Sequence, residues 1–232
     1  MGNFFDFSSD QIHAFMMVVD ESGSMRDHVG EMKRGEAAYK KSFEGFPEAN
    51  SIAISKSHFS TDLDLQYFRP LDEFDNYYSP EGYTALYYAI VRCSKALLDY
   101  MAEIAQKKGI TPGGTFIVLS DGRPEFDQDT RENAKKAIER LNEAGVTTVF
   151  VAFGDAISSE FGKNLGFSAT RDVDDLQYFL GVELSQSCKE QSKSRKSLGA
   201  NFFSQANQSS SSENYSATTN QALEDQDWFE DI

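Results

Sequence analysis

Apolar and polar positions alternate along most of the chain in a pattern that predicts an α/β domain. Continuous apolar runs predict buried strands at residues 12–20, 115–120 and 146–153. Apolar residues spaced three and four apart predict amphipathic helices at residues 29–43, 85–107 and 129–144. Buried strands separated by such helices imply a doubly wound, mostly parallel sheet with helices on both faces.

Shorter segments complete the predicted domain. Residues 50–60 and 63–71 predict a hairpin whose second strand lies at the sheet edge, because Pro70 would interrupt an interior ladder. A helix at 157–164, a strand near 167–171 and a helix from about 174 follow. In sheets of this kind, ligands bind beyond the carboxyl ends of the strands.

The composition changes near residue 185, which predicts the end of the folded domain. The later stretch "SQANQSSSSENYSATTNQ" is polar, rich in serine and nearly free of aliphatic residues. Burial of so few apolar groups does not offset the entropy lost on ordering. We therefore predict one domain over residues 1–185 and a disordered tail over 186–232, with 185–196 as a fraying helix end.

Composition and charge exclude several classes of function. The formal net charge of −15 disfavours nucleic acid, because binding to phosphates requires a basic face. No stretch approaches the roughly 18 apolar residues of a membrane span, and "MGNFFDFSSDQ" has neither a signal pattern nor a good myristoylation site. Cys93 and Cys188 are too few for a disulfide framework. We therefore expect a cytoplasmic protein without a membrane or nucleic-acid partner.

Oxygen-bearing side chains follow two of the predicted strands and precede one helix. Asp20, Ser22 and Ser24 follow the first strand, Asp121 follows the strand at 115–120, and Thr84 stands at the start of the long helix. These hard oxygen ligands favour magnesium or manganese. Taken singly, "DESGSM" and "SDG" are equally consistent with turns, and Thr84 with a helix N-cap. Their joint occurrence at one predicted sheet edge favours a metal site.

These residues resemble the metal-ion-dependent adhesion site of the von Willebrand factor A (VWA) domain family, also called the integrin I-like domain. That site reads Asp-x-Ser-x-Ser, then Thr, then Asp, and the pattern is complete here; "GYTAL" and "VLSDGRP" resemble the threonine and aspartate loops. The resemblance covers about residues 10–185. It implies a six-stranded sheet with one antiparallel edge strand, and a partner protein whose Asp or Glu completes the metal shell.

The resemblance also suggests a cellular role. Members without a signal peptide are similar to intracellular bacterial proteins that work beside MoxR-type AAA+ ATPases or in tellurite- and stress-response systems. The leading hypothesis is therefore a cytoplasmic Mg²⁺-dependent adaptor or regulator. The alternative is a structural or assembly subunit that leaves the metal site unused.

Aromatic residues border the predicted metal loops and also occur near the C-terminus. We predict that Tyr78, Tyr83, Arg123 and Phe126 form a rim that contacts the partner, since aromatic residues contribute much of the binding energy at interfaces; covering the sheet end is an equally good interpretation. The C-terminal "LEDQDWFEDI" surrounds Trp228 and Phe229 with acids. It is typical either of a short docking motif or of a solvated tail, and its acids could visit the protein's own metal site.

Catalysis is the weakest hypothesis. Haloacid-dehalogenase-like phosphatases also begin with an aspartate after the first strand, but they need a second aspartate two residues later, where this chain has Ser22. The histidines are scattered, and no Ser/His/Asp or Cys/His set can be assembled. We therefore predict that the protein is not an enzyme.

Overall fold

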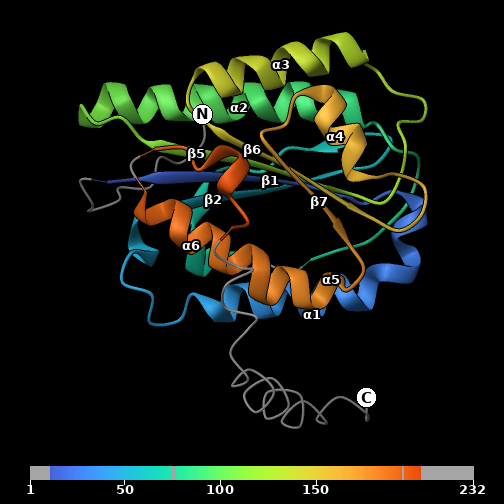
Figure 1. The fold of residues 1–232 in the computed structure, drawn as a ribbon, viewed down its shortest axis with the longest axis horizontal. Helices are drawn as coiled ribbons and strands as arrows, with labels where there is room; N and C mark the ends of the chain where they lie inside the picture. The colour runs from blue at the N-terminus through green and yellow to red at the C-terminus, as the bar shows by residue number, and fades with distance from the viewer. Residues whose placement is uncertain (1–10, 75–76, 195, 205–232) are drawn as a thin grey trace, which may run out of the picture.

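The computed structural model describes residues 11–74, 77–194 and 196–204. A central sheet lies between two layers of helices (Figure 1). The strands are β1 (His13–Asp20), β2 (Ile52–Phe59), β3 (Leu63–Asp64), β4 (Arg69–Pro70), β5 (Gly113–Ser120), β6 (Thr147–Phe153) and β7 (Ala169–Val173). The α-helices are α1 (Val29–Ser42), α2 (Leu86–Lys108), α3 (Arg131–Glu143), α4 (Ser159–Leu165), α5 (Leu176–Tyr178) and α6 (Ser185–Lys193).

Five shorter helical segments join or extend these elements. The 3-10 helices are η1 (Gly23–His28), η2 (Ala49–Ser51), η3 (Leu71–Glu73) and η5 (Gly199–Asn201). A π-helical segment, η4 (Phe179–Leu184), connects α5 to α6. The three long helices predicted from the sequence are therefore confirmed as α1, α2 and α3, with ends shifted by at most two residues.

The strand order is β3-β2-β1-β5-β6-β7, with β4 also pairing with β2. Strands β2, β1, β5, β6 and β7 are parallel, whereas β3 and β4 run antiparallel to β2 at one edge. The predicted doubly wound, mostly parallel sheet with an antiparallel edge is confirmed.

The antiparallel edge is interrupted where one strand over 63–71 is predicted. Gln66 lies in the interruption, and its backbone pairs with side chains of β2 in place of a ladder. Ser55 donates its hydroxyl to the Gln66 carbonyl at 2.8 Å, and Ser57 Oγ accepts from the Gln66 N–H at 3.0 Å. In the stretch between β3 and β4, hydrogen bonds to the side chains of Ser55 and Ser57 on β2 thus take the place of backbone ladder bonds to β2.

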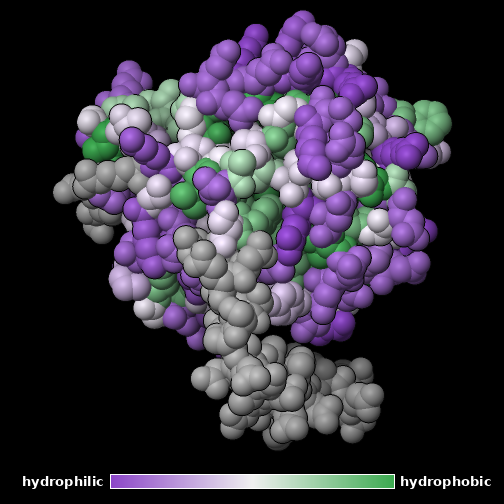
Figure 2. All heavy atoms as spheres, viewed as in Figure 1, coloured by the Kyte–Doolittle hydropathy of each residue, from purple (hydrophilic) through white to green (hydrophobic). Residues whose placement is uncertain are grey.

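Both faces of the sheet are buried, which explains the continuous apolar runs. Along β1, Ala14, Met16 and Val18 belong to one apolar cluster, with residues of α2 and α3. Their neighbours Phe15 and Met17 belong to the opposite cluster, with residues of α1 and the η4 segment. The outer surface seen in Figure 2 is mainly hydrophilic, notably over α3 at the top of the view.

The folded part of the chain continues past the boundary predicted at residue 185. Helix α6 buries Cys188 and Gln191, and the Gln191 side chain accepts a hydrogen bond from Thr147 Oγ1 of β6 at 2.7 Å. Phe202 is completely buried in the core on the α1 side. A polar composition therefore misled the prediction, because one buried helix face and two phenylalanines, Phe202 and Phe203, suffice to anchor this segment.

Two further predictions concern the ends of the chain and membranes. The acidic-aromatic C-terminus, including Trp228 and Phe229, lies outside the described residues. Among the helices of the described ranges, none has both the length and the apolar character needed to cross a bilayer.

Candidate metal centre

Three loops converge at the carboxyl edge of the sheet. Asp20 and Ser120 end the neighbouring parallel strands β1 and β5. The loop that precedes α2 is attached to both: the Gly23 N–H donates to the Gly82 carbonyl at 3.1 Å, and the Glu125 N–H donates to the Thr84 carbonyl at 3.0 Å. Residues that are far apart in sequence are therefore fixed side by side by backbone hydrogen bonds.

Asp20 is the deepest residue of the site and is fully buried. Its Oδ1 accepts from the Ser22 N–H at 2.9 Å, and its Oδ2 accepts from the Ser120 hydroxyl at 2.5 Å. Burial raises the pKa of Asp20 from 3.8 to about 7; the hydrogen bonds from Ser120 and Ser22 oppose this rise, and the nearby Asp121 adds to it. In the absence of a cation, the carboxylate is therefore costly to ionise.

A chain of hydroxyls joins the first loop to Asp121. Ser22 Oγ lies 3.1 Å from Ser24 Oγ, and the Ser24 hydroxyl donates to Asp121 Oδ1 at 2.8 Å. Burial raises the pKa of Asp121, while the hydrogen bond from Ser24 and the charge of His28 act in the opposite direction. Both carboxylates would thus gain from a positive charge placed beside them.

Thr84, the remaining predicted ligand, lies close to Gly122, as Ser24 does. A Cβ atom at Gly122 would lie 3.3 Å from Thr84 Oγ1 and 3.8 Å from Ser24 Oγ, so the glycine leaves open the space that these two hydroxyls face. The hollow around it measures about 810 Å³ and is lined by Ser22, Ser24, Thr84 and Asp121, together with rim residues. Four of the five predicted ligands therefore line this hollow, and the fifth, Asp20, is buried and hydrogen-bonded to Ser22 of the lining.

The donor set fits a small hard cation. Two ligands at right angles on an ion with bonds of about 2.1 Å are separated by about 3.0 Å. The Ser22–Ser24 and Ser24–Asp121 oxygen separations, 3.1 and 2.8 Å, match that value. Within the described ranges no group of three or more His, Cys, Asp or Glu side chains is arranged so that it could hold a metal ion. The site therefore depends on hydroxyls and two carboxylates, as magnesium or manganese permits and zinc disfavours.

The predicted rim residues divide into two groups. Tyr83, Arg123 and Phe126 are exposed near the hollow, Tyr83 by 50% and Phe126 by 76%. Tyr78, in contrast, is only 3% exposed and does not belong to the rim. Its hydroxyl donates to the carbonyl of Asp20, so the buried ring helps to fix the start of the metal loop, residues 20–24.

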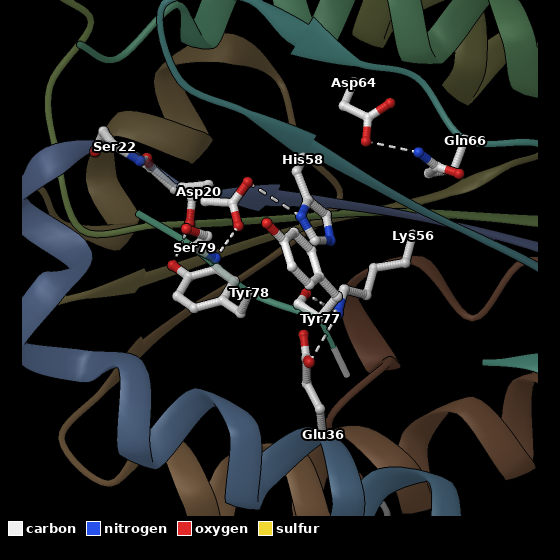
Figure 3. A network of polar contacts seen from close by, with 11 residues as sticks. Asp20, Ser22, Glu36, Lys56, His58, Asp64, Gln66, Tyr77, Tyr78 and Ser79 are labelled. Carbon is white, nitrogen blue, oxygen red and sulfur yellow. Dashed lines mark hydrogen bonds and ion pairs between the residues drawn. The ribbon is translucent and has the colours of Figure 1, made fainter. Parts of the chain in front are cut away.

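A polar network behind the metal loop was not predicted from the sequence (Figure 3). Glu21 contacts His58 Nδ1 at 3.2 Å and accepts from the Ser79 N–H. Further along β2, Lys56 forms a buried 2.8 Å ion pair with Glu36 and donates to the Tyr77 carbonyl at 3.1 Å. This network holds the segment 77–79 against the loop that carries Asp20.

Ser120 is a further residue that sequence reasoning missed as a functional position. Its only sequence signal is its place at the end of β5, directly across from the end of β1. A hydroxyl in that register reaches the carboxylate opposite, which a sequence pattern alone does not show.

Comparisons with known proteins support the fold. No family model and no curated protein matches the sequence. Among solved structures, the pilus adhesin SpaC from Lactobacillus rhamnosus GG is similar, with a TM-score of 0.58 and 14% identity over 79% of this chain and 30% of SpaC. The PilB minor pilin from Streptococcus sanguinis has a TM-score of 0.53 and 13% identity over 80% of this chain and 63% of PilB. The SpRpn10 VWA domain has a TM-score of 0.51 and 11% identity over 73% of this chain and 93% of that domain.

These similarities define the class of fold. The chain has a VWA-like α/β fold, which it shares with the SpRpn10 VWA domain and with part of the pilus adhesin SpaC. It spans less than a third of SpaC and under two thirds of PilB, so the activities of those whole proteins do not transfer to it. At these identities the comparison concerns the fold alone.

Proposed function

We propose that this chain is a Mg²⁺-dependent protein-binding module that acts as an adaptor or regulator. The observation that carries the proposal is the convergence of three hydroxyls and the Asp121 carboxylate around one open hollow, with Asp20 hydrogen-bonded to the Ser22 N–H next to it, at the carboxyl edge of a VWA-like sheet. A partner protein would supply an Asp or Glu to complete the ion's shell. A MoxR-type AAA+ ATPase or a component of a tellurite- or stress-response system is the partner class that we propose.

The chemistry of the site favours an acidic ligand. Ser22, Ser24 and Thr84 would hold the ion through neutral oxygens, with Asp20 and Asp121 bound directly or through water. A bound Mg²⁺ or Mn²⁺ supplies two positive charges. The two aspartates balance that charge, and an octahedral ion with these ligands keeps a position for a further oxygen. A third carboxylate can then approach at modest electrostatic cost.

Calorimetry and capture from cell lysate test the proposal together. We expect Mg²⁺ or Mn²⁺ to bind the wild-type chain and not Asp20→Ala, and we expect partner capture to require both the metal and Asp20. Asp99→Ala is the matched control, because that carboxylate is 63% exposed on α2. Identical captured proteins with Mg²⁺, with EDTA and with Asp20→Ala would refute a role for the metal.

One observation favours the structural or assembly subunit as a second candidate. Both carboxylate oxygens of Asp20 already have hydrogen-bond donors, so the loop is self-consistent without a cation. This candidate predicts no heat of binding for either metal, and partner capture that does not change in EDTA.

We also propose that the protein is not an enzyme and that it works in the cytoplasm. Ser22 Oγ bonds to Ser24, and His58 is engaged with Glu21, so neither is placed as a general acid beside Asp20. Hydrolysis of a generic phosphomonoester by the wild type, lost in Asp20→Asn, would contradict the proposal that the protein is not an enzyme. Cys93 and Cys188 are free and buried, which suits a reducing compartment; localisation in cells tests the second.

A further inference from the structure

Phe126 combines two features that are unfavourable for a folded protein. Its side chain is 76% exposed, and its φ of 50° lies in the left-handed region. It is the only residue other than glycine with a positive φ among those that the structure describes. Bulky side chains rarely adopt this conformation, and such outliers cluster at functional sites.

The neighbours of Phe126 hold it in this position. The Glu125 N–H donates to the Thr84 carbonyl at 3.0 Å. The Asp127 carboxylate accepts from the Tyr87 and Tyr88 N–H groups at 2.5 and 2.9 Å, at the start of α2. Both sides of Phe126 are therefore fixed to the segment that carries Thr84, and the ring points outward.

The exposed ring stands beside the candidate metal centre. It packs against Tyr83 with ring centroids 4.5 Å apart and planes inclined at 53°. Tyr83 lines the same hollow as Thr84 and Asp121. The Tyr83–Phe126 pair is therefore an apolar surface at the edge of a site that would bind an acid group.

The charges at the hollow make binding of an acidic ligand dependent on the metal. Asp121, Glu125 and Asp155 line it, against the single arginine Arg123 and His28. Without a cation these carboxylates repel an acidic segment, whereas a divalent ion reverses the local sign.

We propose that the C-terminal segment of this same chain, residues 223–232, is a ligand of the metal centre. In the sequence "LEDQDWFEDI", Asp227 and Glu230 flank Trp228 and Phe229, so an acid and an aromatic ring are adjacent. One of these two acids would meet the metal, and the neighbouring ring would pack on the Tyr83–Phe126 pair. The inference rests on the proposed metal-dependent function and gives it an internal ligand that competes with the partner.

The length of the chain permits this contact. The last described residue is Ser204, and residues 205–226 separate it from Asp227. A chain of that length spans up to about 70 Å, whereas a domain of this size has a radius of gyration of about 16 Å. A tether of this kind gives an effective ligand concentration in the millimolar range, so even a weak contact between acid and metal would be populated.

Trp228 is the only tryptophan in the chain, so its indole N–H gives a single NMR signal that reports on the segment. We expect Mg²⁺ to shift this signal in the full-length protein and paramagnetic Mn²⁺ to broaden it. Both effects should be lost in Asp227→Asn/Glu230→Gln. They should also be lost in Asp20→Asn/Thr84→Val, which removes the metal centre; broadening that persists there reports Mn²⁺ bound to the acidic segment itself and overturns the proposal.

Phe126→Asn tests the aromatic contact, because asparagine tolerates the left-handed region and removes the ring. We expect unchanged Mn²⁺ binding by calorimetry and weaker broadening of the Trp228 signal. Tyr67→Asn is the control, since Tyr67 is 66% exposed and lies outside the hollow. Equal broadening in both variants would overturn the role of the Tyr83–Phe126 pair.

Two outcomes separate this inference from the proposed function. Calorimetric metal binding with an unchanged Trp228 signal refutes the internal ligand and leaves the metal-dependent module intact, whereas absence of metal binding refutes both. Broadening that disappears on dilution would show contact between two molecules and overturn the intramolecular arrangement.

Discussion

Replacing Asp20 with asparagine should stabilise the metal-free domain at alkaline pH while abolishing its response to Mg²⁺. The amide fits the site: its oxygen can accept from the Ser22 N–H, and its NH₂ group can donate to Ser120 Oγ. The Ser120 hydroxyl can then donate to the Gly122 carbonyl, which lies 3.1 Å away. The variant keeps the hydrogen bonds and removes the buried charge.

The magnitude follows from the pKa of Asp20. Burial raises this pKa from 3.8 to about 7, so between these pH values the folded state binds a proton that the unfolded state has lost. The stability contributed by this group is therefore present at low pH and is lost as the pH rises toward 7. A difference of about three pH units corresponds to about 4 kcal/mol. The amide of the Asp20→Asn variant does not titrate, so this variant should gain up to that amount over wild type at pH 8.

Urea denaturation in EDTA at pH 5 and pH 8 measures this difference. We expect the Asp20→Asn protein to be more stable than wild type by roughly 1.6 kcal/mol at pH 5, which is about 1.2 pH units above the unfolded-state pKa, and by up to about 4 kcal/mol at pH 8. Addition of Mg²⁺ at 100 times its dissociation constant should stabilise the wild type by about 2.7 kcal/mol and leave the variant unchanged. The reasoning is refuted if the variant is less stable at pH 8, or if its stability varies with pH as the wild type's does.

Three other substitutions probe the centre and its support. Thr84→Val should keep the fold and lower Mg²⁺ affinity at least tenfold in calorimetry, because it removes one hydroxyl at constant volume; unchanged affinity would exclude Thr84 as a ligand. Ser120→Ala should destabilise the metal-free protein by about 1–3 kcal/mol at pH 8, since a buried carboxylate loses a donor, and urea unfolding that matches wild type would contradict this. Lys56→Met should cost about 3–5 kcal/mol by leaving Glu36 as a buried charge, and Lys56→Met/Glu36→Leu should recover much of that loss; a double variant less stable than the single one would refute this account.

Most of the sheet and the long helices could be predicted because burial on both faces leaves a clear mark on the sequence. Between His13 and Asp20, each position of β1 is apolar and buried, whichever helix layer it faces. The same logic located the candidate ligands, since parallel strands bring their carboxyl ends to one edge. Metal binding by these residues stays a prediction, although the geometry brings all five together.

The remaining differences arise where tertiary contacts outweigh local pattern. Tyr78 lies near the metal loop in sequence, but the backbone turns its ring inward to meet the Asp20 carbonyl. Helix α6 is polar on average, and only its packing reveals the buried face with Cys188. Ser120 acts through register with the neighbouring strand, which one sequence does not specify.

Asp20 and Glu21, adjacent residues in the motif "DESGS", contribute to the stability of the metal-free domain with opposite dependences on pH. Asp20 points into the core, where the cost of burial dominates and its contribution to stability is lost as the pH rises. Burial also raises the pKa of Glu21, but the hydrogen bonds from His58 and Ser79, together with the charges of His58 and Lys56, outweigh it and leave the pKa below its usual value. The contribution of Glu21 is therefore present above about pH 4.5 and is lost as the pH falls. Through these two groups, the metal-free domain is most stable in mildly acidic solution, and a bound cation, which favours ionised Asp20, extends that stability toward neutral pH.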